Sequence, residues 1–145
     1  MIEEGIYVFG GKNTDGEALN SLKILTLTKT GAIWKYPSVK GKFPAPRYGH
    51  SMLVYDTLGL IIVYGGRNDQ LLNSGDCENF NQISVLSLEL MAWMAISNTG
   101  STLSMPRYHH AAAIVGDSMV IFGGLEPEGY ANDDVAITEI SKYFQ

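Results

Sequence analysis

Short apolar runs separated by turns dominate the chain. Segments such as 60–64 and 119–122 are wholly apolar, and others alternate with a period of two; both patterns predict β-strands. No window of twelve residues combines a helical period of 3.6 with caps. We therefore expect strands at 6–9, 22–27, 32–36, 50–55, 60–64, 83–88, 92–97, 110–115, 119–122 and 135–140.

Two short segments predict hairpin turns between these strands. Gly116 and Asp117 suit a two-residue turn, since glycine readily adopts positive φ. Residues 56–59 predict a longer hairpin loop. The paired strands on either side are apolar on both faces, which predicts sheets that are buried on both sides.

Several sequence features recur at one spacing and in one order. The glycine pairs at 10–11, 65–66 and 123–124 lie 55 and then 58 residues apart, each after an apolar strand. PRYGHS at 46–51 returns as PRYHHA at 106–111, and Trp34 returns as Trp93, 59 residues later. Evenly spaced strands with glycine and aromatic landmarks are typical of β-propeller blades.

The repeats resemble the kelch family, in which each blade is a four-stranded antiparallel sheet with strands a to d. The matching landmarks are Arg47, His50, Gly65, Gly66, 81–83 and Trp93; Arg107, His110, Gly123, Gly124 and 133–135; and Gly10, Gly11, Asn20 and Trp34. The aromatic-Asp pair of kelch strand c is replaced by Leu86-Ser87 and Leu25-Thr26, and the loop 67–80 is long. The resemblance implies an all-β fold of kelch-type blades in an incomplete ring.

We expect three blades within one propeller. Residues 1–40 supply strands b, c and d, residues 41–100 a complete blade, and residues 101–145 strands a, b and c. Propellers typically close with four to eight blades. The remaining blades are therefore expected from the rest of a longer chain or from other subunits. The chain starts at strand b, as kelch rings often do, and its end after strand c indicates a cut.

The repeated residues have structural interpretations beside functional ones. The glycine pairs suit strand ends that need positive φ, and both tryptophans are expected to pack between blades. For Arg47, Arg107, His50 and His110, structural hydrogen bonding and partner contact both stay open. His109 is expected to be an exposed loop residue.

Composition excludes several classes of function. The net charge is −5 with only ten Lys plus Arg, which disfavours nucleic-acid binding. The single cysteine, Cys77, cannot form an internal disulfide, and neither zinc spacing nor a membrane-length apolar run is present. We expect no cofactor, no metal and no membrane, and a cytoplasmic or nuclear location.

The chain shows few signs of an enzyme. Phosphate-binding, zinc-protease and nucleophile-elbow motifs are absent from the sequence. Some kelch-like propellers are copper oxidases or sugar epimerases, so part of such an enzyme stays open as the alternative function. The preferred interpretation is a protein-interaction module, which in this family often lies beside a ubiquitin-ligase or phosphatase module.

The b–c and d–a loops of a blade project from one rim, where the repeats differ most and where a rigid scaffold presents variable loops. The b–c loops carry the acids Asp15, Glu17, Asp69, Asp76, Glu78, Glu126 and Glu128, while the d–a loops carry Lys40, Lys42, Arg47 and Arg107. Tyr and Arg are enriched at binding hot spots. The predicted residues for binding a protein or peptide are Arg47, Tyr48, Arg67, Asn68, Asp69, Arg107, Tyr108 and Tyr130.

Overall fold

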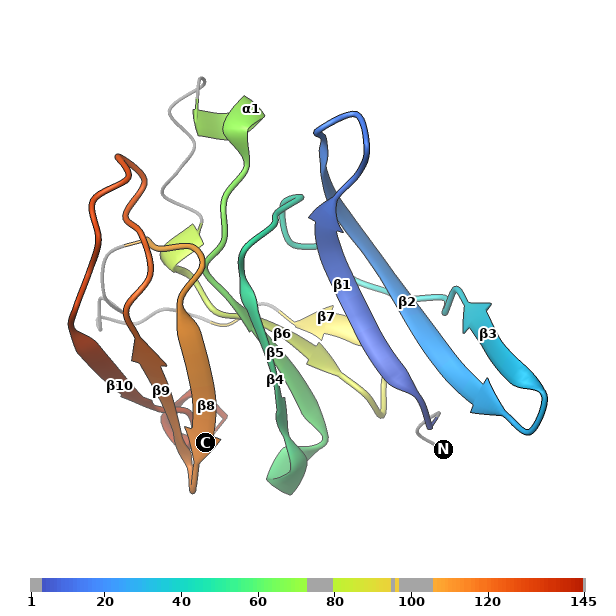
Figure 1. The fold of residues 1–145 in the computed structure, drawn as a ribbon. Helices are drawn as coiled ribbons and strands as arrows, with labels where there is room; N and C mark the ends of the chain where they lie inside the picture. Colours follow the sequence, from blue (N-terminus) through green and yellow to red (C-terminus); the bar gives the residue numbers. More distant parts are fainter. Residues whose placement is uncertain (1–3, 73–79, 95, 97–105, 145) are drawn as a thin grey trace.

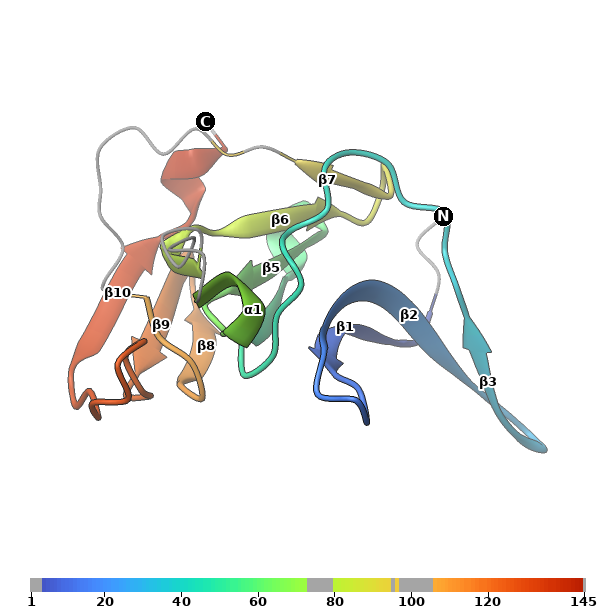
Figure 2. The ribbon, with the colours of Figure 1, turned by 90° about the horizontal axis from the view of Figure 1, so that it is seen from above.

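The structure is a computed structural model that describes residues 4–72, 80–94, 96 and 106–144. In these ranges, ten strands form three antiparallel sheets (Figure 1). Seen from above, the sheets lie side by side in chain order (Figure 2). The predicted all-β fold of antiparallel blades in a partial propeller is confirmed.

Each sheet is one blade, and its strands pair in chain order. Blade one contains β1 (Ile6–Lys12), β2 (Ala18–Thr28) and β3 (Gly31–Lys35). Blade two contains β4 (Ser51–Tyr55), β5 (Leu60–Tyr64), β6 (Ser84–Ser87) and β7 (Ala92–Met94). Blade three contains β8 (Ala111–Val115), β9 (Ser118–Phe122) and β10 (Val135–Glu139). The short helical turns are η1 (Asp56–Leu58), α1 (Asp69–Leu72) and η3 (Ser141–Tyr143).

Both predicted hairpin turns are present. Gly116 and Asp117 join β8 to β9, and Gly116 has a φ of 59°. The longer loop contains η1 and ends at Gly59, whose φ is 60°. Left-handed backbone at these positions explains why glycine occupies them.

The hydrophobic core lies in the two seams between neighbouring blades. Ile61 and Val63 of β5 pack toward blade one, while Leu60, Ile62 and Tyr64 pack toward blade three. All five residues of β5 are buried, so this strand is covered on both faces as predicted, whereas Val54 of β4 is 53% exposed and β8 alternates exposed and half-buried residues. The seam with blade one also contains Phe9, Leu22, Leu86, Leu88 and Trp93, and the seam with blade three contains Tyr55, Ile83, Val85, Met119, Ile121 and Ile140.

The outer faces of blades one and three remain open. On blade three, Phe122 is 55% exposed and Ile137 is 69% exposed, because no described residue packs against that face. Trp34 on blade one is 49% exposed, whereas its repeat partner Trp93 is 5% exposed. The prediction that the tryptophans pack between blades is therefore confirmed for Trp93, while Trp34 meets no second blade within the described residues. Trp93 faces Phe9 of the preceding blade, with ring centroids 5.0 Å apart, whereas no blade precedes Trp34 within the described residues.

Candidate functional site

One rim of the blades carries the loops that the sequence assigns to binding. In Figure 1 the β1–β2 loop, α1 and the β9–β10 loop all lie at the upper rim, while the β4–β5 and β8–β9 turns lie at the lower one. The segments that precede β4 and β8 pair with the loops of this rim, through bridges from Tyr48 to Arg67 and from Tyr108 to Leu125. Residues from all three blades can therefore meet there.

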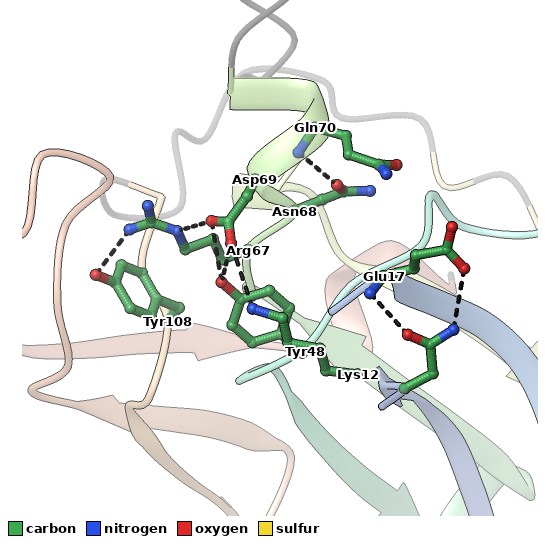
Figure 3. Close-up of polar contacts among 9 residues, drawn as sticks. Lys12, Glu17, Tyr48, Arg67, Asn68, Asp69, Gln70 and Tyr108 are labelled. Atoms are coloured by element: carbon green, nitrogen blue, oxygen red, sulfur yellow. Dashed lines mark hydrogen bonds and ion pairs between the residues drawn. The ribbon is translucent and has the colours of Figure 1, made fainter. Parts of the chain in front are cut away.

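On this rim the carboxylate of Asp69 contacts three hydrogen-bond donors (Figure 3). The hydroxyl of Tyr48 lies 2.9 Å from Oδ2 and 3.0 Å from Oδ1 of Asp69. Nε of Arg67 donates to Oδ1 at 2.5 Å, and Nζ of Lys12 lies 3.5 Å from Oδ2. Lys12 ends β1 of blade one, Tyr48 precedes β4, and Arg67 follows β5. The contacts therefore join blade one to blade two.

The same arginine continues the network into blade three. Nη1 of Arg67 donates to the hydroxyl of Tyr108 at 2.9 Å, and its guanidinium carbon lies 5.0 Å from the centre of that ring. The centroid of the His109 ring lies 5.1 Å from that of the Tyr108 ring and 6.4 Å from that of the Tyr48 ring. We call these six residues the rim cluster: Lys12, Tyr48, Arg67, Asp69, Tyr108 and His109.

Hydrogen bonds and partial burial shift the pKa values of three residues in the rim cluster, Tyr48, Arg67 and Asp69. The hydrogen bond that Arg67 donates to Asp69 lowers the pKa of this carboxyl, and the bond from Tyr48 also lowers it. The pKa of Arg67 is raised chiefly by the same bond. The pKa of Tyr48 is raised by partial burial and by the bond to Asp69, so the phenol stays neutral and donates its proton.

Two of the predicted binding residues form part of the blade scaffold instead. Arg47 and Arg107 are 2% and 1% exposed, and their Nη1 atoms donate to the carbonyl oxygens of Gly65 and Gly123, each at 3.0 Å. Burial lowers the pKa of Arg47 to about 10, so it remains a cation. Arg107 also pairs with Asp134 at 2.7 Å. These contacts favour the structural interpretation, and neither arginine enters the rim cluster.

Asn68 and Tyr130 also lie outside the rim cluster. Asn68 is buried; its Nδ2 donates to the carbonyl of Pro46, and its Oδ1 accepts the backbone N–H of Gln70. These bonds shape the start of α1. Tyr130 is 71% exposed on the β9–β10 loop, and its backbone carbonyl accepts a hydrogen bond from Glu126. Of the eight predicted residues, Tyr48, Arg67, Asp69 and Tyr108 are brought together.

Lys12 and His109 belong to the cluster but were not predicted as binding residues. Lys12 follows Gly11 as Arg67 follows Gly66, so the repeat itself signals that both cations occupy one position. His109 is exposed, as predicted, and has a φ of 54°; its repeat partner Gly49 has a φ of 66°. A histidine in a conformation that favours glycine is visible only in three dimensions.

The part of the chain that the structure describes contains no group of three or more His, Cys, Asp or Glu side chains placed to hold a metal ion. Cys77, Asp76 and Glu78, which sequence reasoning considered, lie outside the described residues. No helix within the described residues is long and apolar enough to span a membrane.

Comparison with known proteins identifies the class. The model of the KLHDC2/KLHL20/DRC7 Kelch-repeats domain matches residues 1–143. The chain therefore belongs to the kelch-repeat family. It is 32% identical to Kelch domain-containing protein 3 of Rattus norvegicus over 124 residues, which cover 86% of this chain and 30% of the relative.

Two further relatives show how widely this unit is used. The chain is 30% identical to Host cell factor 1 of Homo sapiens, with 98% of this chain and 7% of the relative covered. It is 31% identical to Dynein regulatory complex subunit 7 of Chlamydomonas reinhardtii, with 82% and 10% covered. The chain thus spans less than a third of each of these relatives. Membership of this family supports a protein-interaction module in general terms.

Proposed function

We propose that this chain binds a protein or peptide segment at the rim formed by its b–c and d–a loops, with the rim cluster at the centre of the contact. The observation that carries the proposal is the network itself. Side chains from three blades converge there on Asp69 and Arg67. A network that crosses two seams is held rigidly by the blades beneath it, which reduces the entropy lost on binding.

The chemistry of the rim cluster suits a protein partner. Arg67 lies over the ring of Tyr108, and Lys12 lies 4.7 Å from the centre of the Tyr48 ring. Arg and Tyr recur at interface hot spots, because they combine large apolar area with directed hydrogen bonds. The side chains of Lys12 and Arg67 are 41% and 27% exposed, so both cations are accessible to a partner.

Affinity capture with the full-length protein tests this proposal. Replacing Tyr48 and Arg67 together by alanine should remove the partners that wild type retains, because it takes away the aromatic surface and its cation. The matched control is Glu128→Ala, an exposed acid of the β9–β10 loop outside the rim cluster. Its capture profile should equal that of wild type.

Folding is checked separately by circular dichroism and by thermal denaturation of each variant. A double variant that folds normally and keeps every partner would place the binding surface elsewhere. The turns of the opposite rim, at 56–59 and 116–117, would then be the next candidates.

A further inference from the structure

We infer that the rim cluster recognises an acidic side chain of the partner segment, and that Asp69 occupies this carboxylate position in the free protein. The inference rests on the proposed function and names the chemistry that the same surface selects. It follows from the donors around Asp69, from their charge and from their exposure.

The donors around Asp69 form a set suited to a carboxylate. A guanidinium, an ammonium and a phenol all direct hydrogen-bond donors at its two oxygens, within 2.5 to 3.5 Å. The donors come from two blades, whereas the acceptor sits on the four-residue α1. Lys12 and Tyr48 thus lie on segments separate from the one that carries Asp69, while Arg67 precedes Asp69 by two residues.

The charges of the rim cluster favour the binding of a second carboxylate. The rim cluster holds two cations, Lys12 and Arg67, against one carboxylate, although the chain as a whole carries −5. Within the rim cluster this excess of positive charge attracts an acidic side chain, while the acids of the surrounding b–c loops lie outside it. The side chain of Asp69 is 47% exposed, so an incoming carboxylate can reach the same donors.

The geometry favours a side-chain carboxylate within a continuing segment. The donors already bind an aspartate side chain, which shows that a carboxylate on one methylene fits them. The hydroxyl of Tyr48 reaches this position, and the centroid of the His109 ring lies 6.4 Å from that of the Tyr48 ring. Both rings offer surface to the residues that flank the acid. An Asp or Glu inside an extended peptide uses both the donors and the rings.

A purely structural role for Asp69 makes the opposite prediction. If Asp69 only ties blade one to blade two, Asp69→Asn weakens the rim and lowers or leaves unchanged its affinity for peptides. If Asp69 competes with the partner, Asp69→Asn frees the donors and raises affinity for acidic peptides. The sign of the change therefore separates the two roles.

The experiment pans immobilised full-length protein against a phage library of random twelve-residue peptides. Each peptide is joined to the coat protein at its C-terminus, so that only side-chain carboxylates are offered. We expect one peptide position to be enriched in Asp or Glu. The dissociation constant of a selected peptide should fall about threefold to fivefold in Asp69→Asn, the range of an exposed charge pair, and stay unchanged in Glu128→Gln. The same peptide with Gln in place of its acid should bind more weakly and gain nothing.

Each contrary outcome has a separate meaning. Selected peptides that need Tyr48 and Tyr108 but show no acidic preference would overturn the inference and leave the proposed function standing. An affinity that falls or stays the same in Asp69→Asn would also overturn it. Peptides that bind wild type and the Tyr48→Ala, Arg67→Ala variant equally well, or a library from which nothing is selected, would count against both.

Discussion

The backbone N–H of Gly66 in blade two donates to the carbonyl oxygen of Arg107 in blade three, at 2.9 Å. Gly11 makes the same bond to Arg47 across the other seam, at 2.8 Å. Each arginine then donates from Nη1 to the glycine carbonyl of its own blade. One residue therefore joins two blades, through its backbone on one side and its guanidinium on the other.

The first prediction tests how closely the blades approach at the glycine pair. A Cβ on Gly65 would lie 2.5 Å from the carbonyl oxygen of Arg107 and 2.5 Å from Cε1 of His110. Gly65→Ala should therefore destabilise the full-length protein by about 3 kcal/mol or more, from backbone strain and overpacking together. Chemical denaturation measures the change.

Gly116→Ala is its matched control. Gly116 has a φ of 59°, close to the 69° of Gly65, but a Cβ there would meet nothing within 4 Å. It should cost only the backbone strain of about 1–2 kcal/mol. Equal effects for the two variants would show that the seam has room for a methyl group.

The second prediction concerns the core of the first seam. Trp93 is 5% exposed and packs on Phe9 and Phe43, so Trp93→Ala should destabilise the full-length protein by about 3–5 kcal/mol. Leu90→Ala, at a residue 64% exposed in the β6–β7 turn, should change stability by less than about 0.5 kcal/mol. The denaturation midpoints of the two variants and of wild type measure these changes. A change at Trp93 as small as that at Leu90 would place its ring outside the core.

The third prediction concerns acid sensitivity. Burial, together with Arg47, lowers the pKa of His50 from 6.5 to about 4, and burial with Arg107 lowers the pKa of His110 likewise. The unfolded chain therefore binds more protons than the folded chain between pH 4 and 6.5. The contribution of these two histidines to the free energy of unfolding is fully present above pH 6.5 and is lost as the pH falls toward 4.

The free energy of unfolding should fall by roughly 2 kcal/mol between pH 7 and pH 5, less than the full shifts imply because both imidazoles are only partly buried. Urea titrations at the two pH values measure it. Replacing both histidines by glutamine should flatten the pH dependence. An unchanged slope in that variant would assign the acid sensitivity to the carboxylates.

The fourth prediction concerns the open faces of the outer blades. Trp34 and Tyr36 on blade one, and Phe122 and Ile137 on blade three, are each between 49% and 72% exposed. The isolated 145-residue polypeptide should therefore self-associate or have a low melting temperature, because exposed apolar patches of this kind drive association. Sedimentation velocity and thermal denaturation test this. A stable, monodisperse monomer would contradict the view that further blades cover these faces.

The strands and their pairing could be predicted because the signals are local and repeated. Apolar runs and alternation mark the strands, glycine pairs mark the second strand of each blade, and the pairing of Val115 with Ser118 follows from the two-residue turn between them. The exposure of Trp34 could not be predicted from the repeat, because burial depends on whether a blade precedes it. Likewise, the sequence does not show that Arg67 enters the rim cluster while Arg47 is buried in the blade. That difference depends on the direction in which each guanidinium points.

Hydrogen–deuterium exchange of the full-length protein with and without its captured partner tests the central claim most directly, because it maps the contact without any substitution. The account predicts slower exchange in the segments 47–49, 67–71 and 107–109, which carry the rim cluster on blades two and three (Figure 3). The turns at 56–59 and 116–117, on the opposite rim, should be unchanged. Protection confined to those turns, with none at 67–71, would contradict the account.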